Sequence, residues 1–334
     1  GSRVMAKRSP IALTMYALAI FSVAFYIALQ FARKDDTLVR SQVALGTLVE
    51  IQIRGMERAD AWKAMDKVFA EVRRIDTLFS TYKEGGPTWK LNHGSDTLVA
   101  VPDEVAMLLQ RCDELTRDTD GAFDAALEPL IKAWGFDGDS AAVPAPDILT
   151  EALAASGWKH IRLLDDGMVV KTPQAGINFG AIAKGYAVDR AVEVLAEQGV
   201  KEGLVNAGGE VRATGEWSIG IQHPRSPSEL AAVIDLKGKA VATSGDYEQF
   251  FEVDGTRYHH ILDPAGGQPA RGIQSVSVIA DDDVTADALA TAVFVMGVEK
   301  GMEFCTQNPD IEALIIDEQG EIHMTPGFDH YRTR

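Results

Sequence analysis

Cysteine is almost missing from this chain, which has two in 334 residues, Cys112 and Cys305. So few, so far apart, exclude the dense disulfide framework of a small secreted domain. Each lies within a helical pattern of apolar residues, so we expect two buried thiols, with a single disulfide as the open alternative. No cysteine follows the apolar segment near the N-terminus, so a lipoprotein anchor would have no residue to attach to.

Positive charge is also scarce. The chain has 32 Lys and Arg against 49 Asp and Glu, a net charge of −17. Five of the cations lie in residues 1–34, so the other 300 residues carry 27 cations against 49 acids, a net −22. A body this acidic repels polynucleotides, so we expect no nucleic-acid partner. Solubility alone is a sufficient reason for the acidity.

Long apolar runs are lacking except at one place. Residues 9–32 are 24 residues without a charge, enough to span a bilayer, and cations precede them. We therefore expect a tag and cytoplasmic stub at 1–8, a single transmembrane anchor at 9–32, a linker at 33–40 and an exported domain at 41–334. A cleaved signal peptide and a buried soluble helix are the alternatives, although Gln30 stands where a signal-peptidase site would need a small residue.

The rest of the chain shows long amphipathic helices followed by many short strands. Helical spacing predicts helices at 59–79, 103–116, 181–198 and 285–296. Alternating patterns predict a strand at 42–54, bulged at Gly46, another at 175–179, and a train of strands from 204 to 280. This order favours an α+β fold with largely antiparallel sheets, preceded by the transmembrane helix.

The stretch NFGAIAKGYAVD, from Asn178 to Asp189, places a glycine-rich turn at the start of a helix. Unpaired N–H groups at such a terminus attract phosphate, and Lys184 adds a full positive charge. It is not a Walker loop, because the second glycine, Gly185, follows the lysine. Tight packing of the glycines is the simpler alternative.

The stretch VTADALATAVFVMG carries Asp287 and Thr291, four residues apart and therefore on one helix face. A carboxylate and a hydroxyl suit a hard cation such as Mg²⁺ when carbonyls and phosphates complete its shell. The alternative is an acid that complements the helix dipole and a threonine bonded to a backbone carbonyl. The preceding Asp281-Asp282-Asp283 we interpret as a loop and helix cap with no further role.

The stretch YHHILDPAGGQPARG contains two adjacent histidines, His259 and His260, at the end of a strand. A histidine near neutrality can act as a general acid or base. Neighbours on a strand face opposite sides, so only one of the pair can face a given site. The alternative is one buried, hydrogen-bonded histidine and one exposed.

Taken together, the motifs ALGT, FSTY, GAFD, GAIAKGYAVD, NAGGEV, ATSGDY, HHILDP and DALATA, in this order over residues 40–330, resemble the ApbE family of FAD:protein FMN transferases. The resemblance implies an exported, Mg²⁺-dependent enzyme that splits FAD, attaches FMN to a Thr or Ser of a target protein through a phosphoester, and releases AMP. Such post-translational flavinylation acts on subunits of the sodium-translocating NADH:quinone reductase and of Rnf-type complexes. With the anchor, the resemblance implies a catalytic domain in the periplasm, held to the inner membrane.

The resemblance also implies the site residues. The metal would be held by the carbonyl of Ala181 with Asp287 and Thr291, and His260 would be the acid–base group. Asn178 stands where the family commonly has Asp, and Ala290 where some relatives carry an extra acid. The residues that would contact FAD are Leu45, Tyr82, Ala122, Phe123, Asp124, Asn178, Lys184 and Ile261.

Two other functions fit the same motifs. A Mg²⁺-dependent FAD pyrophosphatase, giving FMN and AMP, would need the same pocket with water as the acceptor. A non-enzymatic flavin-binding protein of the cell envelope would need no metal, which Asp287 and Thr291 argue against.

Overall fold

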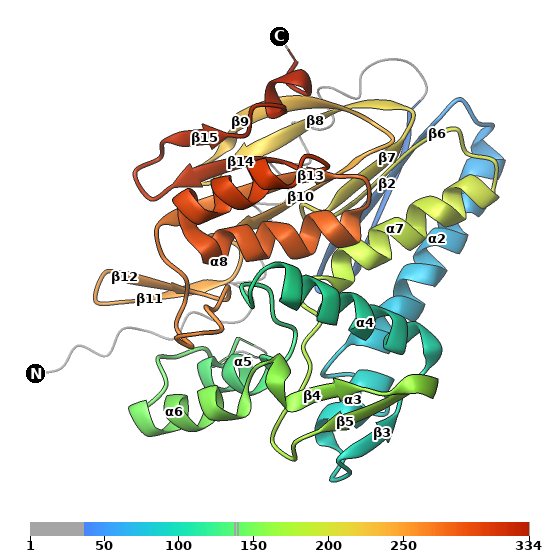
Figure 1. Ribbon diagram of the computed structural model, residues 1–334. Coiled ribbons are helices and arrows are strands. Elements are labelled where there is room, and N and C mark those ends of the chain that lie inside the picture. Colours follow the sequence, from blue (N-terminus) through green and yellow to red (C-terminus); the bar gives the residue numbers. More distant parts are fainter. Residues whose placement is uncertain (1–36, 137, 139, 334) are drawn as a thin grey trace, which may run out of the picture.

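The computed structural model describes residues 37–333 except 137 and 139, and its centre is one eight-stranded sheet (Figure 1). Every neighbouring pair in this sheet is antiparallel. In spatial order the strands are β1 (Leu38–Ala44), β2 (Thr47–Arg54), β6 (Glu202–Ala207), β7 (Val211–Thr214), β10 (Ala240–Gly245), β13 (Ile273–Ala280), β14 (Glu312–Asp317) and β15 (Ile322–Met324).

Three long helices cover one face of this sheet (Figure 1): α2 (Arg58–Phe79), α7 (Ala183–Glu197) and α8 (Asp283–Gln307). The buried residues of α2 recur at helical spacing, as in Ala61, Met65, Val68 and Val72, which gives the helix one apolar stripe. The hairpin of β8 (Glu216–His223) and β9 (Ser226–Lys237) packs on the sheet through a separate apolar cluster. All eight residues of β13 are buried, as expected for a strand covered on both faces.

A second group of elements lies beyond one end of the helices (Figure 1). It contains a small sheet in the order β3 (Leu98–Ala100), β5 (Met168–Lys171) and β4 (Ile161–Leu163). Its helices are α3 (Pro87–His93), α4 (Asp103–Asp118), α5 (Glu128–Trp134) and α6 (Pro146–Ala155). Short 3₁₀ turns at Trp158–His160 and Asp165–Gly167 lie on either side of β4, and a third, at Phe328–His330, follows β15. The hairpin of β11 (Phe250–Val253) and β12 (Thr256–His259) packs its Phe251 and Tyr258 beside Trp134 of α5.

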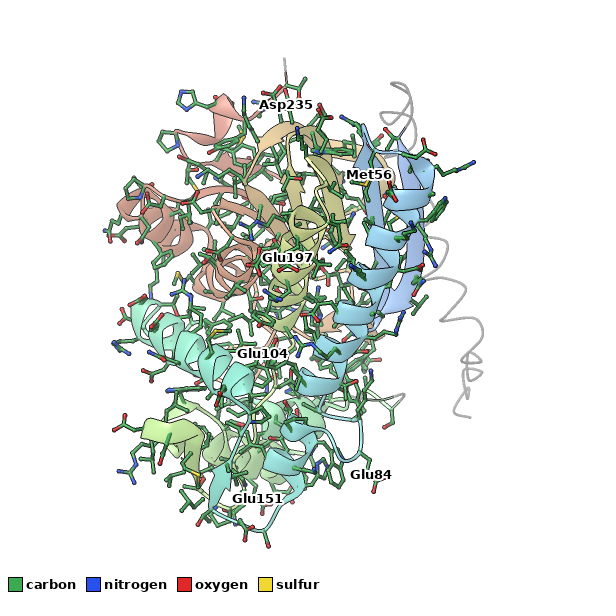
Figure 2. All side chains as sticks on the ribbon, turned by 90° about the vertical axis from the view of Figure 1, so that its right-hand side faces the viewer. Met56, Glu84, Glu104, Glu151, Glu197 and Asp235 are labelled. Carbon is green, nitrogen blue, oxygen red and sulfur yellow. The ribbon has the colours of Figure 1, made fainter. Side chains whose placement is uncertain are left out.

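Glu104 at the start of α4 joins the two groups. Its carboxylate accepts hydrogen bonds from Arg74 of α2 at 2.6 Å and from the Tyr186 hydroxyl of α7 at 2.7 Å. Figure 2 looks onto α2, with Met56 before its start and Glu84 beyond its end, and Glu104 lies between them. Because Glu104 holds two helices at once, it fixes the start of α7 relative to α2.

The structure confirms the α+β fold with antiparallel sheets and the four predicted helices. The bulged strand at 42–54 is wrong: two strands are joined by a turn at Leu45 and Gly46, whose φ angles are +54° and +71°. Two residues in the left-handed region make the turn that matches strand twist in a two-residue hairpin. The strand at 175–179 is also wrong, because this segment is a loop. The last helix is longer than expected and continues to Gln307 past a break at Gly297.

Within the described residues, no helix is both long enough and apolar enough to span a membrane. The stub at 1–8 and the expected anchor at 9–32 lie outside the described residues, as does most of the linker at 33–40. β1 begins at Leu38, so the end of that linker belongs to the sheet. Cys112 and Cys305 are both buried free thiols, as expected.

Candidate active site

The start of α7 and the first turns of α8 touch at Gly185. A Cβ atom at this position would collide with the backbone carbonyl of Asp283 and lie 2.9 Å from the Cβ of Asp287, so only glycine fits. The Gly185 N–H donates a hydrogen bond of 2.9 Å to Oδ2 of Asp287. The predicted phosphate turn and the predicted metal carboxylate therefore meet, although they are far apart in sequence.

Lys184 lies at this crossing and pairs with a carboxylate that the sequence did not single out. Its Nζ is 2.6 Å from Oε1 of Glu210, which is 2% exposed in the turn before β7. Burial alone would lower the pKa of Lys184, but the charges of Glu210 and two further carboxylates outweigh it and hold that pKa above its ordinary value. Lys184 is therefore a fixed positive charge at the start of α7.

Asp287 is 3% exposed and lies one turn before Thr291 on α8. Burial and the neighbouring charge of Glu210 raise the pKa of Asp287 to about 7, against the opposing effect of Lys184. The Thr291 hydroxyl lies 3.2 Å from the Ser244 hydroxyl of β10. The Thr291 hydroxyl thus lies at the end of a central strand, while the Asp287 carboxylate one turn earlier bonds to Gly185 of α7.

Two more acids complete this buried cluster. The carboxylate of Asp189 on α7 accepts hydrogen bonds from the N–H groups of Asp283 and Val284, and so caps α8 from the neighbouring helix. It also pairs with Arg212 at 2.6 Å. Asp283 is fully buried, and burial with the charges of Asp189 and Glu210 raises its pKa well above the ordinary value.

The interpretation of residues 281–283 as loop and cap alone is wrong in part. Asp282 does cap α8, since its Oδ1 accepts from the Thr285 N–H at 2.8 Å. Asp283, however, is buried inside the cluster. A run of three acids gives no indication in sequence of which one the packing of α7 will cover.

The two histidines differ in burial: His259 is the last residue of β12, and His260 follows the strand. His259 is 3% exposed, donates from Nε2 to the Ala270 carbonyl at 2.8 Å and packs edge-on against Phe294. Burial lowers its pKa. His260 is half-buried, with Nδ1 3.3 Å from the Gln249 carbonyl. Burial, with the charges of His259 and Lys184, lowers the pKa of His260 to about 4, so it is a neutral base near Lys184 at pH 7.

The residues expected to contact FAD come from several loops. Leu45 occupies the β1–β2 turn and is half-buried, in contact with the apolar core on the helix-covered face of the sheet. The Tyr82 side chain after α2 is 71% exposed. In the loop before α5, Ala122 is half-buried and the Phe123 side chain is in the core, while Ile261 after β12 is 4% exposed. Their roles towards FAD stay predictions.

Asp124 and Asn178 have structural partners of their own. The Asp124 carboxylate accepts from the N–H groups of Ala126 at 2.7 Å and Trp158 at 2.8 Å, which ties its loop to the segment before β4. The Asn178 side chain donates to Glu128 Oε2 at 2.8 Å and accepts from the Gly180 N–H at 2.8 Å. This amide thus shapes the turn that leads through Ala181 to α7. An aspartate there would place a second carboxylate against Glu128.

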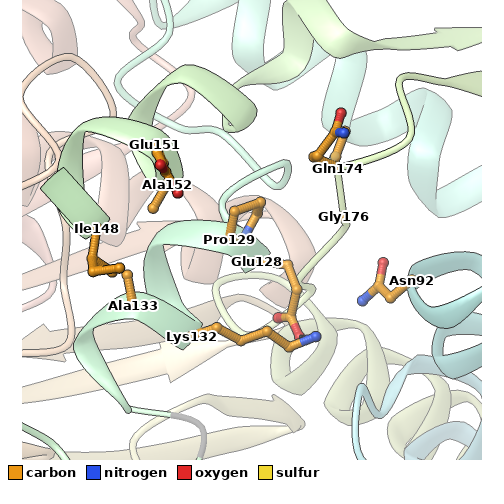
Figure 3. Close-up of a pocket in the computed structure, with 11 residues that line it drawn as sticks. Asn92, Glu128, Pro129, Lys132, Ala133, Ile148, Glu151, Ala152, Gln174 and Gly176 are labelled. Carbon is orange, nitrogen blue, oxygen red and sulfur yellow. Dashed lines mark ion pairs between the residues drawn. The ribbon is translucent and has the colours of Figure 1, made fainter. Parts of the chain in front are cut away.

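A pocket of 420 Å³ opens on the other side of Glu128 (Figure 3). None of the predicted site residues lines it. It is bordered by Glu128 and its partner Lys132 on α5, 3.2 Å apart, and by Asn92 across the opening. The pocket is therefore a neighbour of the Asn178 turn and separate from the α7–α8 crossing.

In the part of the chain that the structure describes, one group of three possible metal ligands has its ligand atoms within 4.8 Å of one another: Asp317, Glu321 and His323. It lies at the turn between β14 and β15, where His323 Nε2 is 2.7 Å from Asp317 Oδ2. None of the predicted metal ligands belongs to this group.

Known proteins resemble this chain closely. The sequence model of the ApbE family matches residues 45–315. A FAD:protein FMN transferase of Treponema pallidum (strain Nichols) is 33% identical over 313 residues, 86% of each chain, and one of Klebsiella pneumoniae (strain 342) is 33% identical over 290 residues, 84% of this chain and 90% of the relative.

Solved structures also resemble this chain in fold. The ApbE protein of Thermotoga maritima MSB8 has a TM-score of 0.85 at 36% identity, covering 90% of this chain and all of that one. The flavin transferase ApbE of Vibrio cholerae has a TM-score of 0.81 at 28% identity, covering 89% of this chain and 99% of that one. From the matched family sequence, the relatives and the shared fold, it follows that this chain belongs to the ApbE family.

Proposed function

We propose that this chain transfers FMN from FAD to a Thr or Ser hydroxyl of a target protein, with Mg²⁺ as cofactor and AMP as the second product. The observation that carries the proposal is the meeting of Lys184, Gly185 and Asp287 at the α7–α8 crossing. It joins a helix N-terminus, a fixed cation and a carboxylate, which are the parts that a diphosphate with a bound metal needs. The choice of FAD as the diphosphate substrate rests on the relatives, which are named FAD:protein FMN transferases.

The residues at the crossing fit a magnesium ion. Asp287, Thr291 and the Ala181 carbonyl offer only oxygen, the ligand type that Mg²⁺ prefers. Buried carboxylate oxygens without a hydrogen-bond partner lie in the same cluster, on Glu210 and Asp283. A bound Mg²⁺ supplies charge neutralisation at the diphosphate and stabilises AMP as the leaving group.

The chain's own groups bind and orient the diphosphate. Lys184 adds a charge that stays positive at any working pH and attracts the diphosphate. The N–H groups at the start of α7 are already partly paired, since that of Ala183 donates to the Phe179 carbonyl and that of Gly185 to Asp287. These groups are preorganised by Glu210 and by the Gly185 contact, so they need little rearrangement when charge develops on the phosphorus.

His260 receives the proton in this proposal. The target hydroxyl oxygen forms a bond to the FMN phosphorus, the bridging P–O bond of FAD breaks, and the electron pair leaves on AMP. The hydroxyl proton passes to the neutral imidazole of His260. His259 is excluded from this role because its Nε2 is engaged with the Ala270 carbonyl in the core.

The cellular setting is part of the proposal. The targets would be flavoprotein subunits of the sodium-translocating NADH:quinone reductase or of Rnf-type complexes. The domain would face the periplasm, tethered to the inner membrane by residues 9–32.

The test incubates the full chain with FAD, Mg²⁺ and a recombinant target domain. We expect flavin fluorescence on the target in a denaturing gel, the added mass of FMN, and one AMP per modified target. FMN and AMP without a labelled target would replace the proposal by a pyrophosphatase. Bound FAD that stays intact would leave only a flavin-binding protein.

A further inference from the structure

Three buried carboxylate oxygens have no hydrogen-bond partner among the described residues: both of Asp283 and Oε2 of Glu210. A buried acceptor without a partner costs about 1–3 kcal/mol, and more when it is charged. Asp283 is fully buried and Glu210 is 2% exposed, and both interact electrostatically with Asp287. In the described part of the chain, every buried carboxylate oxygen without a partner thus belongs to one cluster around the predicted metal ligand.

The spacing of residues along α8 also places Asp283 beside the predicted metal ligands. Asp283, Asp287 and Thr291 are successive residues four apart, so they form one row along one helix face. Neighbours in such a row have Cβ atoms about 5–6 Å apart. Asp283 is therefore one turn from the proposed cation, on the same side of the helix.

The charges of the cluster do not balance. Four buried carboxylates, those of Asp189, Glu210, Asp283 and Asp287, face two cations, Lys184 and Arg212. The carboxylate of Glu248, which interacts electrostatically with Lys184, Glu210 and Asp287, adds to this excess of negative charge. Buried charges without compensation are strongly unfavourable, so the cluster needs a cation or bound protons.

The cluster is too wide to be a cage of direct ligands. Among the described residues, the group with three ligand atoms within 4.8 Å of one another is Asp317, Glu321 and His323, and it contains no member of this cluster. Mg²⁺ usually keeps several of its waters and binds through one or two carboxylates.

We propose that Asp283 and Glu210 are the outer-shell carboxylates of the cation site: their free oxygens accept hydrogen bonds from waters on a Mg²⁺ held by Asp287. The inference rests on the proposed function for the cation itself. Outer-shell partners orient and strengthen a metal site, and their loss typically weakens binding about 10–100-fold. They also favour a small, strongly hydrated cation over Ca²⁺, which sheds its water more readily.

The test measures Mg²⁺, Mn²⁺ and Ca²⁺ binding to the full chain by calorimetry, without FAD. Asp283→Asn keeps the shape of the side chain, and we expect it to weaken Mg²⁺ binding about 10–100-fold and Ca²⁺ binding less. The matched control is Asp281→Asn, an exposed acid in the same loop that pairs with Lys239, and it should leave both affinities unchanged. Glu210→Gln, on a different element, is the second variant and should weaken Mg²⁺ binding in the same direction.

Thermal unfolding separates this role from a purely structural one. Without metal, Asp283→Asn should unfold at the same or a higher temperature than the parent chain, because it removes an unpartnered buried acid. Added Mg²⁺ should then stabilise the variant less than the parent. Equal Mg²⁺ affinity in the parent and in both variants would overturn the inference and leave the proposed function intact. A parent chain that binds no Mg²⁺ would overturn the cation of the proposed function, and the inference with it.

Discussion

The N–H of Gly185 donates to Oδ2 of Asp287 across 102 residues of sequence. This hydrogen bond joins the only two helix turns that the sequence marked for anion and cation binding. It also explains the glycine, because any side chain there would meet the carbonyl of Asp283. The proposed site for a metal-bound diphosphate thus depends on how closely two helices approach each other.

The first prediction tests that approach. Gly185→Ala should push α7 and α8 apart and lower the free energy of unfolding by about 1–3 kcal/mol, as overpacking does. Mg²⁺ and FAD binding should weaken as well, because the Asp287 contact is at the same point. Urea unfolding and calorimetry measure both effects.

The control for this change is Gly266→Ala. A Cβ atom there would have only the Asp263 carboxylate within reach, at 3.3 Å. We expect a change within about 0.5 kcal/mol and unaltered binding. Equal effects of the two substitutions would show that the α7–α8 contact is not special.

The second prediction concerns the ion pair of Lys184 and Glu210, 2.6 Å apart. Lys184→Met leaves a buried, unpaired carboxylate and should destabilise the fold by about 3 kcal/mol, while transfer is lost. Adding Glu210→Gln should restore much of the stability, since the carboxylate that lost its partner is then neutral, without restoring transfer. Recovery of both stability and transfer in the double variant would show that Lys184 only supports the fold.

The third prediction is the pH dependence of stability without metal. The pKa of Asp287 is raised to about 7 in the folded chain, above its unfolded value of about 3.9. The folded state therefore binds this proton more tightly, and its contribution to stability is lost as pH rises from about 4 through 7. In EDTA, the free energy of unfolding should fall over this range, and less so in Asp287→Asn. Mg²⁺ should restore stability above pH 7 in the parent chain only. A pH profile that Asp287→Asn leaves unchanged would contradict this assignment.

The sequence predicted those features of the site that depend only on the spacing of nearby residues. The four-residue interval between Asp287 and Thr291 fixes a shared helix face, and adjacent histidines on a strand must face opposite sides. In the structure Asp287 and Thr291 are one turn apart on α8. His259 ends β12 and is buried, whereas His260 follows the strand and is half-buried. The sequence did not predict the hairpin turn at Leu45 and Gly46, because the apolar alternation continues through it. The pattern alone could not distinguish a bulge from a turn.

Some of the features that the sequence did not predict depend on contacts between residues far apart in the chain. Nothing near Asp283 in sequence shows that Gly185 of another helix will pack against its backbone carbonyl. Glu210 lies in the NAGGEV motif, but its partner Lys184 is on a different element. The short helices α5 and α6, of seven and ten residues, give too few turns for a helical period to be read.

The last prediction concerns His260, which the structure leaves half-buried while His259 is fixed in the core. If His260 accepts the proton of the target hydroxyl, His260→Ala should slow transfer by about 10²–10⁴-fold and leave FAD and Mg²⁺ binding nearly unchanged.

The pH profile adds a second readout. The sequence alone suggests a rate limb near the ordinary imidazole pKa of about 6.5. Burial and nearby charge lower the pKa of His260 to about 4, so the limb of kcat/KM, which reports the free enzyme, should lie well below 6.5. That limb should vanish in His260→Ala.

His259→Ala is the control: it removes a buried side chain that packs on Phe294 and bonds to Ala270, so it should lower stability first. A folded His259→Ala that loses more activity than His260→Ala would move the base to the other histidine. A loss of only a few-fold in both would leave positioning by Lys184 and Asp287 to carry the reaction.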